Sequence, residues 1–143
     1  MYLRAQPIQL SFEKNAMKKL LFILCLLTSS VYAQEPVQVV QAQLDAYNNQ
    51  DVNAFAAVFA EDAKLYMNLG DTEPTMTGRD EIRRRYGAMF EANPENKSTL
   101  IGRMTQGNFV IDHEWITGRD EPITIMAIYE VVDGKIIRCW FPR

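Results

Sequence analysis

Apolar residues recur at helical spacing in three segments of the N-terminal half of the chain. The first segment covers residues 36–48 and begins with Pro36, at the position where a helix best tolerates proline. Asp51 is a favourable N-cap for a short second helix, which Glu61-Asp62 ends. The third helix runs from about residue 79 to residue 92 and ends before Pro94. The apolar stripes contain Val37, Val40, Leu44 and Tyr47; Phe55, Val58 and Phe59; and Ile82, Tyr86, Met89 and Phe90.

The rest of the chain alternates between apolar and polar residues with the period of β-strands. A short strand at 63–69 is followed by a long loop, and the third helix then leads into a series of strands. Turns with Gly or Pro separate these strands, and Asp133-Gly134 is a strong signal for a tight hairpin. The order predicts one α+β domain whose helices cover one face of a curved antiparallel sheet. The later strands are expected at 98–104, 108–117, 123–132 and 135–141.

Residues 17–33 have the layout of a secretory signal peptide. Lys18 and Lys19 precede an unbroken apolar run at 20–27, and a small-x-small pattern predicts cleavage before Gln34. The apolar run is much shorter than the ~20 residues that span a bilayer, so it predicts no stable membrane anchor.

Met17 is a better start for such a signal than Met1. Residues 1–16 are then an over-extended start, and the alternative is a longer leader. We therefore expect a periplasmic or secreted protein in which residues 1–33 are leader and signal peptide. Residues 34–143 are expected to form a single domain, because about 110 residues suffice for one core and not for two.

The charge and cysteine content of this domain exclude several functions. From Gln34 onward the chain holds 11 Lys and Arg and 17 Asp and Glu, a net charge of −6. An acidic surface repels phosphate backbones, so we expect no nucleic-acid partner. Cys139 is the one cysteine left after cleavage, so no internal disulfide can form. It stands in the apolar run IIRCWF and is interpreted as a buried small hydrophobe.

Three titratable residues, Asp112, His113 and Glu114, stand side by side in the strand at 108–117, and His113 is the only histidine of the chain. Successive strand residues point to opposite faces, so the two carboxylates share one face and His113 takes the other. Metal ligands must converge on one ion, and no second histidine can complete a site. The sequence therefore predicts neither a metal nor a cofactor.

Two orientations of this strand are open. In the first, the bulkier apolar set faces the core together with His113, and the carboxylates are solvated or paired with an arginine. In the second, Asp112 and Glu114 face an apolar interior, where desolvation and mutual repulsion would raise the pKa of at least one carboxyl. The apolar sets are Phe109, Ile111 and Trp115 for the first orientation and Val110 and Ile116 for the second; the candidate arginines are Arg103 and Arg138.

Four segments together resemble the nuclear-transport-factor-2-like superfamily, in its SnoaL-like (polyketide cyclase) and ketosteroid-isomerase-like branch. They are AYNNQDVNAFAAVFAEDAKLY, TGRDEIRRRY, GNFVIDHEWITG and AIYEVVDGKIIRCWF, and they span nearly all of the domain. The resemblance implies a cone-shaped antiparallel sheet wrapped around three N-terminal helices. It also implies an apolar pocket at the open end of the cone, with Val110, Asp112, Glu114 and Ile116 lining it, which is the second of the two orientations.

The known catalytic residues of that superfamily do not carry over to this chain. Gln43 stands where ketosteroid isomerases have a tyrosine, Met67 where they have the base, and Ala127 near their second aspartate. The tyrosine and asparagine of the related epoxide hydrolases correspond to Leu65 and Met67. The resemblance therefore implies a pocket without a borrowed mechanism.

The leading functional hypothesis is binding of a small, largely apolar molecule, with acid–base conversion by a cofactor-free isomerase, lyase or hydrolase. Asp112 or Glu114 would carry the proton, with His113 or Tyr129 as helper. The alternative is a non-catalytic ligand-binding or dimerisation module of the same fold. A carboxylate inside the pocket would favour the enzyme.

The strands also predict a homodimer. Both alternating sets of the strand at 108–117 contain bulky apolar residues, and the strand at 135–141 repeats this pattern. The helices can cover only one face of the sheet, so the outer face needs another partner. The resemblance implies the same back-to-back pairing; the alternative is a monomer whose loops or C-terminal residues cap that face.

Overall fold

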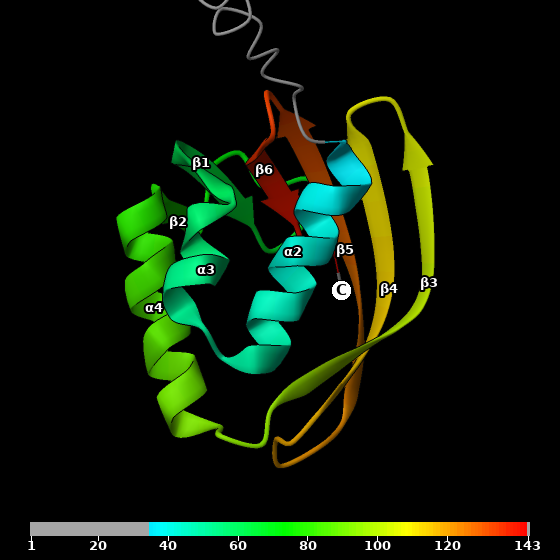
Figure 1. Cartoon of the computed structure of the whole chain (residues 1–143). Helices are drawn as coiled ribbons and strands as arrows, with labels where there is room; N and C mark the ends of the chain where they lie inside the picture. Colours follow the sequence, from blue (N-terminus) through cyan, green and yellow to red (C-terminus); the bar gives the residue numbers. More distant parts are fainter. Residues whose placement is uncertain (1–34, 143) are drawn as a thin grey trace, which may run out of the picture. The chain divides into compact units, whose positions relative to one another are not determined.

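A computed structural model describes residues 35–142 of the protein. The expected leader, signal peptide and cleavage site before Gln34 lie outside these residues and stay predictions. No helix within the described part of the chain is long and apolar enough to cross a membrane. Figure 1 shows helices α2 (Pro36–Asn49), α3 (Val52–Ala57) and α4 (Arg79–Ala92), and strands β1 (Phe59–Tyr66), β2 (Met76–Thr77), β3 (Lys97–Gln106), β4 (Phe109–Thr117), β5 (Ile123–Val132) and β6 (Lys135–Trp140).

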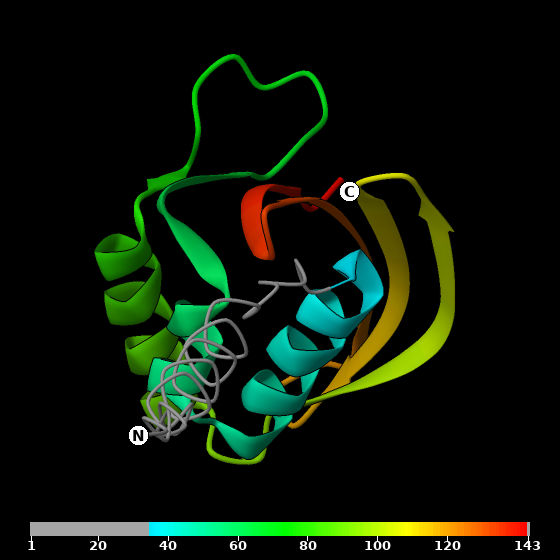
Figure 2. The same cartoon turned by 45° about the horizontal axis from the view of Figure 1, so that its top comes forward.

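The six strands form one sheet in the order β2-β1-β6-β5-β4-β3. The sheet curves around the helices, which lie on its concave face (Figure 2). This confirms the predicted α+β cone and its three helices. The antiparallel prediction holds for every pair except β1 and β6, which run parallel. The tight turn after β5 sets the direction of β6, and no hairpin joins β6 to β1, so nothing forces that pair to be antiparallel.

The second helix ends earlier than its apolar spacing predicted. Phe59 stands four residues after Phe55 and so fits a helix, but it is the first residue of β1 and lies opposite Ile136 of β6. The backbone N–H of Ile136 donates to the carbonyl of Val58 at 2.9 Å. Pairing with β6 therefore overrides helical spacing at this point, and β1 is longer than expected.

An aromatic cluster joins the three helices beneath the sheet. The rings of Phe55 and Tyr86 lie 4.3 Å apart between centroids, and those of Tyr47 and Phe90 lie 5.4 Å apart in an edge-to-face arrangement. The predicted N-cap is confirmed, because the Asp51 carboxylate accepts hydrogen bonds from the N–H groups of residues 53 and 54. The cluster fixes Tyr47 and Tyr86 where both can reach the pocket described below.

Candidate functional site

Strand β4 adopts the second of the two orientations that the sequence left open. Asp112 and Glu114 are buried on the concave face, between the equally buried Val110 and Ile116. His113 is exposed on the opposite face. The inward face can hold two carboxylates because each meets polar partners from a neighbouring strand.

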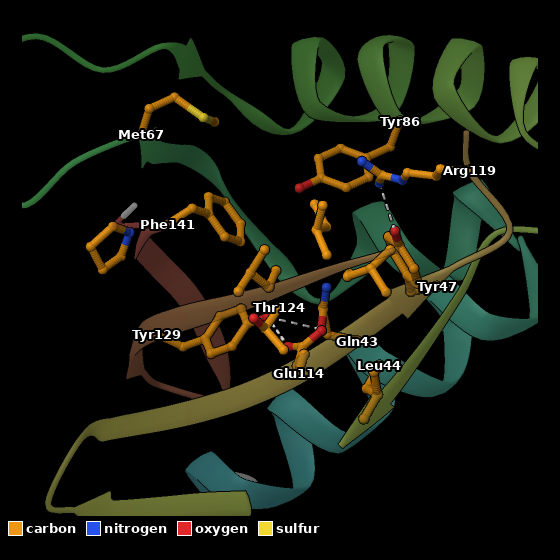
Figure 3. Close-up of a pocket in the computed structure, with 14 residues that line it drawn as sticks. Gln43, Leu44, Tyr47, Met67, Tyr86, Glu114, Arg119, Thr124, Tyr129 and Phe141 are labelled. Carbon is orange, nitrogen blue, oxygen red and sulfur yellow. Dashed lines mark hydrogen bonds between the residues drawn. The ribbon is translucent and has the colours of Figure 1, made fainter. Parts of the chain in front are cut away.

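A pocket of about 660 Å³ lies between the helices and the concave face of the sheet (Figure 3). Its wall combines aliphatic side chains, three tyrosines and two charged groups. Helix α2, strands β4 and β5, the turn between them, and the residues after β6 all contribute. The lining residues are Gln43, Leu44, Tyr47, Met67, Tyr86, Glu114, Ile116, Arg119, Ile123, Thr124, Ile125, Tyr129, Phe141 and Pro142.

Glu114 is the one carboxylate that lines this pocket. Burial raises the pKa of Glu114 above the ordinary value, and the hydrogen bond from Ser98 lowers it in part. The nearby Asp112 charge raises the pKa further. Ser98, on β3, donates its hydroxyl proton to one carboxylate oxygen of Glu114. Its other oxygen lies 3.4 Å from the hydroxyl of Tyr129. Glu114 therefore exchanges its proton nearer to neutral pH than an exposed glutamate does.

Tyr129 joins Glu114 in the pocket, as one of the sequence hypotheses required. Its hydroxyl lies 3.4 Å from both Glu114 Oε1 and Gln43 Oε1, so its single proton can go to either acceptor (Figure 3). Burial raises the pKa of Tyr129 well above the ordinary value, with the Glu114 carboxylate adding to the shift. Tyr129 therefore stays a neutral hydrogen-bond donor.

Asp112 is buried beside the pocket but does not line it. Arg103 of β3 donates from Nε and Nη2 to the two carboxylate oxygens, at 2.6 and 2.7 Å. The Nη1 group of Arg103 donates to Gln41 of α2 at 2.9 Å. The carboxylate of Asp112 is thus held in an ion pair with two parallel hydrogen bonds from Arg103. Both carboxylate oxygens of Asp112 are engaged by Arg103, so Asp112 has a structural role in the sheet and does not contact the pocket.

The structure separates His113 from the other candidates. Its side chain is exposed on the convex face, opposite Met126 of β5, whereas the pocket lies on the concave face. A β-strand of this kind cannot bring His113 and Glu114 to the same ligand. The proposed helper role of His113 is therefore inconsistent with the geometry, and the Tyr129 alternative is the one left.

Arg119 is a pocket residue that sequence reasoning missed. It stands in the turn after β4, in GRDEP, which the pattern marks only as a turn. Its Nε donates to Asn96 Oδ1 and its Nη2 to the Tyr47 hydroxyl, each at 3.0 Å. No motif connects these three positions, because they come from two loops and a helix. Arg119 and Tyr47 form a group of their own in the pocket, apart from Glu114 and Tyr129 (Figure 3).

Two further sequence interpretations concern metal and thiol chemistry. Residues 35–142 contain no group of three or more His, Cys, Asp or Glu side chains placed to hold a metal ion. Cys139 is fully buried, as expected, and burial raises the pKa of its thiol well above the ordinary value. Cys139 is therefore an inert core residue and no candidate nucleophile.

Comparison with known proteins places this geometry in a family. The family model for the SnoaL-like domain matches residues 40–139. A cystatin-fold protein from Novosphingobium aromaticivorans is 26% identical, with a TM-score of 0.69 over 76% of this chain and 97% of that one. None of the curated proteins compared with the chain matches it in sequence.

Two further solved structures share the fold at lower identity. A protein from Sinorhizobium meliloti assigned as a polyketide cyclase is 23% identical, with a TM-score of 0.63 over 73% of this chain and 93% of that one. A protein from Kribbella flavida assigned as a ketosteroid isomerase is 24% identical, with a TM-score of 0.63 over 78% and 80% of the two chains. Gln43 and Met67, which the sequence resemblance aligned with the tyrosine and the base of ketosteroid isomerases, both line the pocket. Neither side chain can exchange a proton.

Proposed function

The chain belongs to the SnoaL-like domain family, and from this membership we propose that its pocket binds a small molecule and exchanges a proton with it through Glu114. The observation that carries the proposal is the position of Glu114. It is a buried carboxylate with a raised pKa on the wall of a pocket that aliphatic side chains also line. Perturbed carboxylates in such pockets are suited to acid–base chemistry.

The proposed chemistry needs only residues of this chain. Ionised Glu114 takes a proton from a carbon next to a carbonyl group, and neutral Glu114 returns that proton to the same molecule. A raised pKa makes Glu114 a stronger base than an ordinary glutamate, since basicity follows pKa. Ser98 and Tyr129 donate hydrogen bonds to the carboxylate and hold it in place between the two steps. Isomerisation of a carbonyl compound fits this proton movement; in an elimination neutral Glu114 would give the proton to the leaving group instead.

Glu114→Gln tests the proposal through hydrogen exchange. We expect the protein to catalyse exchange of the α-protons of 2-tetralone or cyclohexanone with solvent deuterium, followed by nuclear magnetic resonance. The variant is expected to lose about 10²-fold or more of this rate, since glutamine cannot accept the proton. The wild-type rate should rise with pH through a midpoint above the ~4.3 of an ordinary glutamate, because the base must be ionised.

His113→Gln is the control for this experiment. His113 lies on the far side of the same strand, so the variant should exchange protons at the wild-type rate. Equal rates for wild type and Glu114→Gln would contradict the catalytic part of the proposal. Ligand binding without exchange would instead support the alternative, a carrier module that shares the fold and lacks the chemistry.

We also propose that two copies of this chain pair through the convex face of the sheet. Large apolar side chains are exposed there on three adjacent strands: Met104 (69% exposed) on β3, Phe109 (42%) and Trp115 (40%) on β4, and Met126 (46%) on β5. Light scattering should give a dimer mass for the wild type at micromolar concentration. Met126→Glu should give a folded monomer, because it puts a charge in the middle of this face. A monomeric wild type would refute the pairing.

A further inference from the structure

Arg119 brings an unpaired positive charge to the pocket wall. None of the salt bridges among residues 35–142 involves it, although Asp120 and Glu121 follow it in the same turn. Its guanidinium donates through Nε and Nη2, to Asn96 and Tyr47, and weakly to the sulfur of Met89. The Nη1 group makes no hydrogen bond within the described residues. A permanent cation therefore faces the pocket, and its Nη1 group is free to donate hydrogen bonds to a ligand.

Tyr47 adds a second free donor next to it. The Tyr47 oxygen accepts from Asn96 Nδ2 and from Arg119 Nη2, so its lone pairs are engaged. Its own proton has no acceptor within hydrogen-bonding distance in the described part of the chain. A phenol oxygen that accepts from a guanidinium becomes a better donor through its own proton, because hydrogen bonds in series polarise one another. This end of the pocket offers hydrogen-bond donors and a positive charge. It therefore fits a ligand group that is negatively charged and accepts hydrogen bonds.

Buried contacts hold this group in position. Asn96 is fully buried, and its amide contacts both Arg119 and Tyr47. Gly118 allows Arg119 to reach Asn96, because a Cβ at this position would lie 1.8 Å from the carbonyl oxygen of Glu95. Gly118 also has φ +77°, which favours glycine. Arg119 is an exposed residue, but the close approach of two loops and its hydrogen bonds to Asn96 and Tyr47 place its guanidinium on the pocket wall.

We infer that the natural ligand carries a carboxylate, which Arg119 and Tyr47 bind, on an apolar body. The inference rests on the proposed function and names the substrate class for that site. A carboxylate matches the planar guanidinium and accepts hydrogen bonds without donating any. The apolar body fits the aliphatic wall formed by Leu44, Ile116 and Ile125. A doubly charged phosphate fits less well, since Glu114 shares the pocket.

The two polar groups of the pocket, Arg119 with Tyr47 and Glu114 with Tyr129, then have different roles. Arg119 and Tyr47 anchor one end of the ligand, and the body extends toward Glu114 and Tyr129 (Figure 3). Anchoring an unreactive end fixes the orientation of the reacting carbon, which is how remote binding groups assist catalysis. The substrate class is thus a carboxylic acid whose reactive carbonyl lies some distance along an apolar chain or ring.

Matched acids and amides test this inference. Isothermal titration calorimetry would compare 2-naphthoate with 2-naphthamide, and 4-phenylbutyrate with 4-phenylbutyramide. We expect the wild type to bind each acid about tenfold more tightly than its amide, the gain from hydrogen bonds to a charged group. Arg119→Met keeps the aliphatic stem and should bind acid and amide equally. Arg84→Met removes the same charge from an exposed site on α4 and should keep the wild-type preference.

The amides separate this inference from the proposed function. If the wild type binds the amides as tightly as the acids, Arg119 and Tyr47 do not bind a carboxylate and this inference is wrong. That result would not contradict the proposed pocket or the proposed role of Glu114. An Arg119→Met variant that keeps the preference for acids would also overturn it. If neither acids nor amides bind at millimolar concentration, both the anchor and the ligand pocket fail. Glu114→Gln should keep the preference for acids even where it abolishes proton exchange.

Discussion

Replacing Arg103 with methionine is expected to lower the free energy of unfolding by about 3–5 kcal/mol. Asp112 is 0% exposed and owes both of its short hydrogen bonds to this guanidinium. Without Arg103 its negative charge is buried and unpaired, which is the costly way to break an ion pair. Urea unfolding followed by circular dichroism would measure the change.

Two companion variants show that the buried charge is responsible. Arg103→Met with Asp112→Asn removes the charge along with its partner and should recover a large part of the loss. Arg83→Met breaks the ion pair with Asp80 on α4, where the Asp80 side chain is 92% exposed. That change should cost no more than about 1 kcal/mol, since exposed pairs contribute little. Equal losses for Arg103→Met and Arg83→Met would contradict the structural role of Asp112.

Gly118→Ala is expected to destabilise the protein and to abolish the preference for acids over amides. The left-handed backbone at φ +77° alone costs a residue with a Cβ roughly 1–2 kcal/mol. The collision with the backbone of Glu95 adds to this, because the atoms that the Cβ would meet belong to the main chain and not to a flexible side chain. The turn must then move and take Arg119 away from Asn96. Urea unfolding and the acid–amide titrations would record the two effects.

Gly107→Ala is the matched control for that variant. Gly107 also has positive φ, at +56°, but nothing lies within 4 Å of a Cβ added there. It should therefore show the backbone cost alone and leave ligand binding unchanged. Similar losses of stability and of acid preference in both variants would mean that the contact of Gly118 with Glu95 does not position Arg119.

Local signals explain why most of the fold could be predicted from the sequence. The stripes of the helices, the Asp51 cap and the Asp133-Gly134 turn all act between residues a few positions apart. Asp133 and Gly134 both have positive φ in the structure, as this kind of hairpin turn requires. The misplaced end of the second helix shows the limit of such signals. Phe59 satisfies the helical spacing, but its strand partner Ile136 is far along the chain.

The site was only partly predictable, because distant residues decide it. Both faces of β4 carry bulky apolar residues, so its pattern could not show which face is inward. Asp112 and Glu114 point inward because Arg103 and Ser98, on the neighbouring strand, supply hydrogen bonds there. The sequence around Arg119 indicates a turn and contains no motif that would mark this residue as part of a binding site. Its role depends on a loop contact that no spacing rule describes.

The Tyr129–Gln43 contact has a consequence for the order of events during folding. The two residues are separated by 86 positions along the chain, and one comes from the first described helix and the other from the fifth strand. Contacts between positions so far apart close a long loop, and they form late because the entropy of closure must be overcome first. We therefore expect the pocket to be among the last parts of the domain to be completed during folding. A ligand that enters it binds only the finished fold, so binding slows unfolding and protects the whole domain.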